Sequence, residues 1–224
     1  MLEARRLNAG YGAARVLFDV ELAARRGEVV ALLGRNGAGK STTLKTLMGL
    51  IRPFSGEVHF DGRRIDAWEP YEVARAGLGY VPEDRRIFTD LTVAENLQVG
   101  RHPPREATPA WSPQKLFQLF PALQVLQDRR AATLSGGEQQ MLCIARTLAG
   151  NPKAILLDEP TEGLAPMIVE QVEKAILELK RAGVCVLLSE QNLAFARRVA
   201  DRGYVLEQGQ MRQAGTLEHL ELVI

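Results

Sequence analysis

The sequence contains little cysteine, little net charge and no long hydrophobic run. Its 2 cysteines, Cys143 and Cys185, lie in apolar stretches without metal-ligand spacing, which predicts buried thiols in a reducing compartment. A net charge of +1 supplies no bulk attraction to nucleic acid or to an acidic membrane. No apolar run is long enough to span a bilayer, and we expect no secretory leader. The chain is therefore expected to be globular and unable to form a path through a membrane.

A glycine-rich loop is the strongest positive signal. The string GRNGAGKS at Gly34–Ser41 fits G-x-x-x-x-G-K-[ST], a loop that holds nucleotide phosphates. It lies between a predicted buried strand, Val29–Leu33, and a predicted helix, Ser41–Leu50, so that backbone N–H groups and a helix N-terminus face one anion. We predict that Lys40 contacts the β- and γ-phosphates and that the Ser41 hydroxyl ligates Mg²⁺. The predicted phosphate-binding residues are Gly34, Arg35, Asn36, Gly37, Ala38, Gly39, Lys40, Ser41 and Thr42.

Two carboxylates end a second predicted strand, AILLDE at positions 154–159. Because an apolar strand cannot bury charge cheaply, acids at its end are expected to project into a site. We predict that Asp158 holds the Mg²⁺ shell and that Glu159 polarises the water that attacks the γ-phosphate. The alternative is a pair of solvated loop acids, which the phosphate loop upstream disfavours.

A second exposed helix N-terminus is predicted at LSGGEQQ, Leu134–Gln140, which opens a helix running to about Ala149. Ser135 is a favourable N-cap, and Glu138 stands at the spacing of a capping box. The two glycines leave the helix end bare and able to approach phosphate. The alternative is an ordinary capped helix.

These strings together resemble ABC-type ATPase subunits, whose signature is LSGGQ or LSGGE. The resemblance implies an ATPase that uses ATP and Mg²⁺. It also implies a head-to-tail dimer in which the signature of one subunit closes over ATP held by the phosphate loop of the other. The signature residues to which the resemblance assigns this nucleotide contact are Ser135, Gly136 and Gly137.

Four further positions match or depart from the family pattern. Tyr11 stands where the family places an aromatic that stacks on adenine, although a half-buried hairpin tyrosine is the alternative. Glu83 replaces a frequent Gln, and the resemblance implies that it reaches Mg²⁺ or its water. Gln191 replaces a His at the γ-phosphate; it can form hydrogen bonds but cannot take up a proton. Ala165 replaces an Asp that crosses to the partner, which removes a polar contact.

Longer strings resemble one branch of the family. Four of them occur in a fixed order and are similar to one of the two ATPase subunits of bacterial importers for branched-chain amino acids. In chain order they are PEDRRIF, LTVAENL, DEPTEGLAP and SEQNLAFA. Importers of urea and short amides share many of these strings. A remote alternative is a soluble ABC ATPase acting on ribosomes or DNA, but such proteins usually carry two fused units or a long coiled-coil insertion.

The importer resemblance also implies partners and a location. The expected partners are membrane permease subunits, a second ATPase chain that is either identical or related, and, indirectly, a solute-binding protein. No nucleic-acid partner is expected. The expected location is peripheral, on the cytoplasmic face of the inner membrane.

The order of strands and helices predicts an α/β fold with a mostly parallel sheet and crossover helices. The resemblance implies a P-loop NTPase (RecA-like) core, a small N-terminal antiparallel β subdomain and an inserted α-helical subdomain. We expect one domain, with its core at 1–84 and 151–224 and a helical signature subdomain at 85–150. Helical spacing predicts one helix over Lys115–Leu126 after a loop at His102–Pro113. The apolar spacing of this segment favours plain core packing. The resemblance implies in addition a groove for a membrane subunit, with walls near Glu83–Phe88 and Phe117–Phe120.

Overall fold

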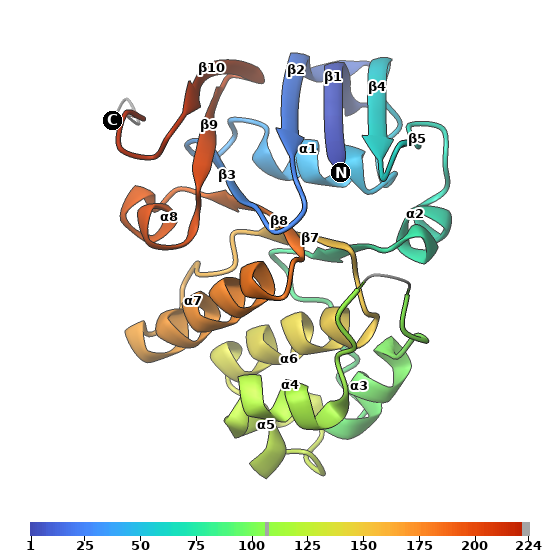
Figure 1. Ribbon diagram of the computed structural model, residues 1–224, viewed down its shortest axis with the longest axis vertical. Helices are drawn as coiled ribbons and strands as arrows, with labels where there is room; N and C mark the ends of the chain where they lie inside the picture. The colour runs from blue at the N-terminus through green and yellow to red at the C-terminus, as the bar shows by residue number, and fades with distance from the viewer. Residues whose placement is uncertain (106–107, 221–224) are drawn as a thin grey trace.

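The computed structural model describes residues 1–105 and 108–220 and contains two sheets with a layer of helices below them (Figure 1). The first sheet is antiparallel, with the strand order β2-β1-β4-β5. Its strands are β1 (Leu2–Tyr11), β2 (Ala14–Ala24), β4 (Ser55–Phe60) and β5 (Arg63–Arg64). This sheet is the predicted N-terminal β subdomain.

The second sheet has the strand order β10-β9-β3-β8-β7-β6 and is parallel except for the edge strand β10. Its strands are β3 (Val29–Leu33), β6 (Leu78–Val81), β7 (Ala154–Asp158), β8 (Cys185–Glu190), β9 (Arg202–Glu207) and β10 (Gln210–Gly215). Every residue of β3, β7 and β8 is buried, as expected for parallel strands covered on both faces. The predicted fold class, an α/β P-loop NTPase core with a mostly parallel sheet, is confirmed.

Alternate residues of the central strands point into two different cores. Val29, Ala31 and Leu33 belong to a core shared with the helical layer. Val30 and Leu32 belong to the other core, shared with the antiparallel sheet and with α1 (Lys40–Leu47). Because side chains alternate across a strand, these apolar runs hold the two layers of the molecule together.

The helices fall into two groups. The first group surrounds the parallel sheet and comprises α1, α2 (Pro70–Ala76), α7 (Pro166–Arg181) and α8 (Leu193–Val199). The second lies at the end of the molecule opposite the antiparallel sheet and comprises α3 (Val93–Gly100), α4 (Pro113–Leu119), α5 (Pro121–Val125), the short 3₁₀ helix η1 (Ala131–Thr133) and α6 (Gly136–Ala149) (Figure 1). The second group falls inside the predicted helical subdomain; the boundaries 1–84, 85–150 and 151–224 stay predictions.

The prediction of a single helix over Lys115–Leu126 is wrong, because the chain is not continuously helical there. The chain forms α4 and α5, with Phe120 between them at φ −130° and ψ 76°. Pro121 has no N–H for the helix ladder and disfavours the helical conformation of the residue before it. The apolar spacing nevertheless identified core positions, because Leu116, Phe120 and Leu123 are buried together.

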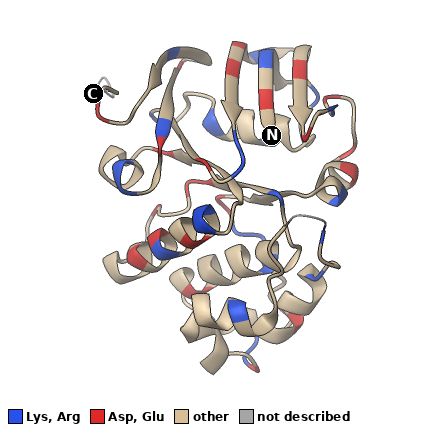
Figure 2. Ribbon diagram, viewed as in Figure 1, with Lys and Arg blue, Asp and Glu red and all other residues tan. Residues whose placement is uncertain are grey.

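Other local expectations are confirmed. Both cysteines are free and buried. Among the described residues, no helix is both long and apolar enough to cross a bilayer. Charges of both signs occur on the same elements, for example along α7, so neither sign dominates one layer (Figure 2).

Candidate functional site

The site forms where the carboxyl ends of three parallel strands meet. In the sheet, Leu33 of β3 lies beside Glu190 of β8, and Asp158 of β7 lies beside Ser189 of β8. The phosphate loop follows β3, Glu159 follows β7 and Gln191 follows β8. Ligands of open α/β sheets bind at such a carboxyl edge. The fold therefore brings together residues that are far apart in the sequence.

The phosphate loop requires its glycines for conformation and for space. Gly39, the residue before α1, has φ 107°, which side chains rarely adopt, and a Cβ there would lie 2.8 Å from Leu17 Cδ2. A Cβ on Gly34 would lie 2.4 Å from the Leu206 carbonyl oxygen. Gly37 has φ 79° but faces open space. Arg35 and Asn36 are exposed at the loop tip, whereas the remaining predicted loop and helix residues, Ala38 and Thr42, are buried.

Lys40 lies inside the loop and is tied to Glu159. Its ammonium donates to the carbonyl oxygens of Gly34 at 2.8 Å and Arg35 at 3.1 Å. It also forms an ion pair with Glu159 Oε1 at 2.9 Å, and only 3% and 7% of these two side chains are exposed. The two residues predicted to act at the γ-phosphate therefore form an ion pair with each other.

Gln191 closes a small network around the same carboxylate. Its amide nitrogen donates to Glu159 Oε2 at 2.7 Å and to Asn36 Oδ1 at 2.8 Å. Burial opposes ionisation of Glu159, but hydrogen bonds from Lys40 and Gln191 outweigh it and hold the pKa of Glu159 below its usual value. Glu159 also has φ 45°, an uncommon conformation for a residue with a side chain. The predicted catalytic residues Lys40, Glu159 and Gln191 thus form one connected group.

Asp158 accepts hydrogen bonds from three hydroxyl groups. Ser41 and Ser189 donate to its Oδ1 at 2.9 Å and 2.7 Å, and Tyr80 donates to its Oδ2 at 3.0 Å. The carboxyl group is 1% exposed. Burial and the neighbouring Asp158 raise the pKa of Tyr80, so the phenol stays protonated and remains a donor.

The oxygen atoms of Ser41 and Asp158 fit a magnesium ion. Adjacent ligand oxygens around octahedral Mg²⁺ lie about 2.9 Å apart, given metal–oxygen distances of about 2.0–2.1 Å. The Ser41 Oγ to Asp158 Oδ1 separation is 2.9 Å. Hydroxyl and carboxylate oxygens are also the hard ligands that Mg²⁺ prefers.

Glu83 and Tyr11 are not joined to this centre. Glu83 is exposed, and in the described residues no hydrogen bond or ion pair connects it to Ser41 or Asp158. Tyr11 is 52% exposed at the end of β1. It lies on the β1–β2 hairpin, whose Leu17 packs beside Gly39 of the phosphate loop. The roles of Glu83 at the metal and of Tyr11 at adenine stay predictions.

The signature segment has the predicted local structure. Ser135 caps α6, and the reciprocal bond with Glu138 completes the capping box at 3.4 Å and 2.7 Å. Ser135 and Gly136 are exposed, whereas Gly137 is half-buried against Ile168 of α7. Within the described residues, no hydrogen bond connects Ser135–Gly137 to the phosphate loop of the same chain.

A largely apolar groove of about 400 Å³ is lined by residues of α2, β6, α3 and α6. Pro82, Arg86 and Phe88 line it, so part of the segment Glu83–Phe88 borders a groove, and its contact with a membrane subunit stays a prediction. Phe120 is fully buried in the core and no residue of Phe117–Phe120 lines this groove, so the role of that segment as a wall for a membrane subunit stays a prediction without support from it. The apolar spacing of that segment reflects core packing rather than a surface.

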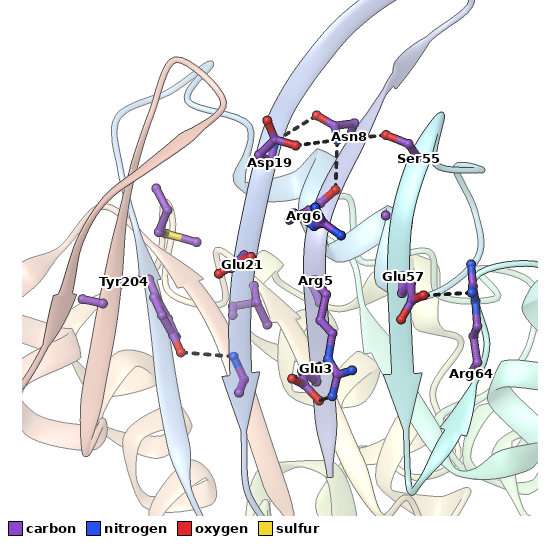
Figure 3. A pocket seen from close by; sticks show the side chains of 16 residues that line it. Glu3, Arg5, Arg6, Asn8, Asp19, Glu21, Ser55, Glu57, Arg64 and Tyr204 are labelled. Carbon is purple, nitrogen blue, oxygen red and sulfur yellow. Dashed lines mark hydrogen bonds and ion pairs between the residues drawn. The ribbon is translucent and has the colours of Figure 1, made fainter.

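A broader groove of about 1300 Å³ lies over the antiparallel sheet, away from the phosphate loop (Figure 3). Several of its charges pair within the groove: Arg5 pairs with Glu3 at 2.8 Å, and Arg64 pairs with Glu57 at 2.9 Å. None of the predicted phosphate or metal residues lines it. It is therefore not the candidate nucleotide site.

Sequence reasoning missed Ser189 and Tyr80 at the centre of the site. Ser189 accepts from the Glu159 N–H at 3.0 Å and donates to Asp158, so it holds both acids in place. For Ser189 a signal was available, since it directly follows the apolar run Val184–Leu188, whereas no strand was predicted around Tyr80. Strand pairing was needed to show that they share a face with Asp158.

Comparison with known proteins gives the family. A sequence profile described as ABC transporter matches residues 17–162. The chain is 43% identical over 211 residues to the high-affinity branched-chain amino acid transport ATP-binding protein BraG of Pseudomonas aeruginosa, covering 94% of this chain and 91% of that protein. It is 36% identical over 222 residues to the lipopolysaccharide export system ATP-binding protein LptB of Haemophilus influenzae, covering 98% and 92% respectively.

Solved structures agree with this relationship. The ATP-binding subunit of an ABC transporter superposes with a TM-score of 0.85 at 34% identity, covering 97% of this chain and 90% of that one. A dimeric ATP-binding cassette in a post-hydrolysis state, bound to ADP and Pi, superposes with a TM-score of 0.82 at 25% identity, covering 97% and 99%. Together with the phosphate loop and the carboxylates facing it, these matches show that the chain belongs to the ABC transporter family and is an ATPase of that family.

Proposed function

We propose that this ATPase powers the import of branched-chain amino acids through a membrane ABC transporter. The observation that carries the solute class is the 43% identity to BraG over nearly the whole of both chains, against 36% to LptB. A second relative, named as a probable branched-chain amino acid transport ATP-binding protein, LivF of Archaeoglobus fulgidus, supports the same class. The ATPase reaction itself rests on the group formed by Lys40, Asp158 and Glu159.

Hydrolysis follows from the positions of these side chains. The Lys40 ammonium leaves Glu159 and contacts the β- and γ-phosphates, while the loop N–H groups neutralise the remaining charge. Glu159, released from this pair, accepts a proton as a water oxygen attacks the γ-phosphorus. The bond from phosphorus to the bridging oxygen breaks, and ADP and inorganic phosphate leave. Gln191 remains a neutral donor to the carboxylate or to the γ-phosphate.

Ser41 and Asp158 form the proposed metal site for this reaction. Ser41 and Asp158 would hold Mg²⁺, which supplies charge neutralisation for the phosphate oxygens when it is bound. Ser189 and the backbone N–H of Glu159 hold the strand end in position. Because hydrogen bonds already hold the Ser41 and Asp158 oxygens in place before nucleotide binds, these groups need to move less when the γ-phosphate reacts.

The signature helix is proposed to complete the nucleotide site of a second ATPase chain. ABC ATPase subunits work as dimers with membrane permease components, and one solved relative is a dimer with ADP and Pi. Ser135 and Gly136 are exposed at the N-terminus of the 14-residue helix α6, so another molecule can reach this end. Its free N–H groups favour a phosphate supplied by the other chain.

The apolar groove lined by Pro82 and Phe88 is the proposed docking place for a cytoplasmic segment of a permease subunit. The mostly apolar lining would receive the apolar face of an amphipathic segment, and Arg86, Arg105 and Arg146 at the same groove would contact its polar groups. The protein would then lie peripherally on the cytoplasmic face of the membrane, and a solute-binding protein would act on it only through the permease. No nucleic-acid partner is proposed.

The test is uptake of labelled leucine and labelled urea in cells from which this chain has been deleted. The cells are complemented with the native sequence or with Lys40→Ala, which removes the phosphate-binding ammonium. Loss of leucine uptake that only the native chain restores supports the proposal. Loss of urea uptake alone identifies the amide importer class instead. Unchanged uptake of both contradicts the import proposal.

A lipopolysaccharide exporter is a second candidate, because the similarity to LptB covers 98% of the chain. The same deletion strain distinguishes it. An exporter motor is expected to alter lipopolysaccharide at the cell surface and leave leucine uptake intact, whereas an importer motor is expected to do the reverse.

A further inference from the structure

Tyr80 connects the apolar groove to the carboxylate that we propose binds the metal. Its hydroxyl donates to Asp158 Oδ2 at 3.0 Å. Ser41 and Ser189 both bind the other oxygen, Oδ1. Tyr80 is therefore the partner of the second oxygen, and its bond adds to those of the two serines in restraining the rotation of the carboxylate.

Strand pairing explains why this tyrosine reaches the site. Tyr80 of β6 lies beside Leu156 of β7, and Asp158 stands two residues further along β7. Residues two apart on a strand share a face, so Tyr80 and Asp158 point to the same side of the sheet. Ser189 lies beside Asp158 on the next strand and also faces this side. The edge strand β6 thus contributes one long side chain to the metal carboxylate.

We propose that Tyr80 is a positioning residue for Mg²⁺: its hydroxyl fixes Oδ2 so that Oδ1 faces the Ser41 hydroxyl. The inference rests on the proposed metal role of Ser41 and Asp158. A free carboxylate presents either oxygen, or both, to a cation. Here Oδ1 is 2.9 Å from Ser41, a spacing that an octahedral ion matches, and the bond from Tyr80 holds that arrangement. Partners of this kind orient metal ligands and affect metal affinity.

Packing alone does not account for the hydroxyl. The ring of Tyr80 lines the groove and packs against the core beneath the antiparallel sheet, which a phenylalanine would do equally well. The phenol oxygen, in contrast, bonds to Asp158, which is 1% exposed. Removal of the oxygen leaves the groove wall in place and removes one of the three hydrogen bonds to the carboxylate.

The test compares Tyr80→Phe with the native chain in nucleotide and metal binding. ATP affinity is measured by calorimetry in EDTA, and Mn²⁺ binding to the ATP complex is measured by electron paramagnetic resonance. We expect unchanged ATP affinity in EDTA and Mn²⁺ affinity lowered about tenfold, the lower end for loss of such a partner. Tyr204→Phe is the matched control, because its hydroxyl bonds to Ala23 and Arg202 rather than to the site.

The possible results distinguish the positioning role of Tyr80 from the metal site itself. Equal Mn²⁺ affinity in Tyr80→Phe and the native chain overturns the positioning role. A loss of ATP affinity in EDTA assigns Tyr80 to the structure of the nucleotide site and also overturns it. If Ser41→Ala and the native chain bind Mn²⁺ equally, the proposed metal site itself is wrong. A selective loss of metal affinity in Tyr80→Phe, absent from Tyr204→Phe, supports the inference.

Discussion

The buried pair between Lys40 and Glu159 makes a quantitative prediction about nucleotide affinity. ATP must replace Glu159 as the partner of Lys40 before the ammonium reaches the phosphates. At 2.9 Å, the pair has a gross attraction of about 6 kcal/mol at an effective dielectric constant of about 20. Desolvation offsets much of this, and a net contribution of about 1.5–3 kcal/mol is usual for a charged hydrogen bond.

Glu159→Gln removes this competition and the negative charge that faces the phosphates. We expect ATP and ADP to bind about 10- to 150-fold more tightly in EDTA, the ratio that corresponds to about 1.5–3 kcal/mol. Hydrolysis in Mg²⁺ is expected to fall by a factor of at least about 100, because the proton acceptor is gone. Without nucleotide, the variant is expected to lose about 3 kcal/mol of stability, since Lys40 keeps only carbonyl partners.

The assay is calorimetry of ATP and ADP at protein concentrations where sedimentation shows a monomer, so that dimer closure does not contribute. Glu173→Gln is the matched control, because it also removes a carboxylate from an ion pair, the one with Arg198 of α8, and leaves Lys40 and Glu159 in place. Affinity unchanged or weakened in Glu159→Gln would refute the reasoning, because it would show that the ion pair does not compete with nucleotide.

Three further predictions concern other parts of the chain. Gly136→Trp is expected to reduce ATP hydrolysis at least about tenfold while leaving ATP binding in EDTA intact, because its side chain blocks the exposed helix end; lost binding would argue against a shared site. Burial raises the pKa of the Glu190 carboxyl group, although Thr161 donates a hydrogen bond to it. The protonated carboxyl group therefore stabilises the folded protein at pH values below its unfolded pKa, and this contribution is lost as pH rises through its folded pKa. Glu190→Gln is therefore expected to raise the melting temperature at pH 8 more than at pH 4.5, and equal shifts would contradict this. Burial raises the pKa of Cys143 to about 11 and that of Cys185 to about 12, so neither thiol is expected to react with a disulfide reagent at pH 8 until the protein is denatured.

The local structure of the nucleotide site was predictable from short strings. The phosphate loop follows β3 and precedes α1 as expected, and Ser135 caps α6 through the bond that the sequence spacing indicates. These features depend on residues within a few positions of one another, where glycine conformation and capping bonds are decided locally. The continuous helix at Lys115–Leu126 failed for an equally local reason, because Pro121 interrupts it.

The contacts between distant residues were not predictable in the same way. The pairing of Lys40 with Glu159, and the bond from Tyr80 to Asp158, depend on which strands are neighbours. The order of the central strands, β9-β3-β8-β7-β6, differs from their order in the sequence. The role of Glu83 at the metal still rests on family resemblance, because its exposed side chain makes no hydrogen bond to Ser41 or Asp158 among the described residues.

The sequence by itself therefore determined the class of chemistry: a phosphate loop, an acidic strand end and a bare capped helix, each specified by local backbone preferences. The tertiary structure alone decided which of these groups meet. It places Ser189 and Tyr80 on the face of Asp158, because side-chain direction alternates along strands and register sets the partners. It also holds Lys40 against Glu159, because two buried opposite charges lower their free energy by pairing.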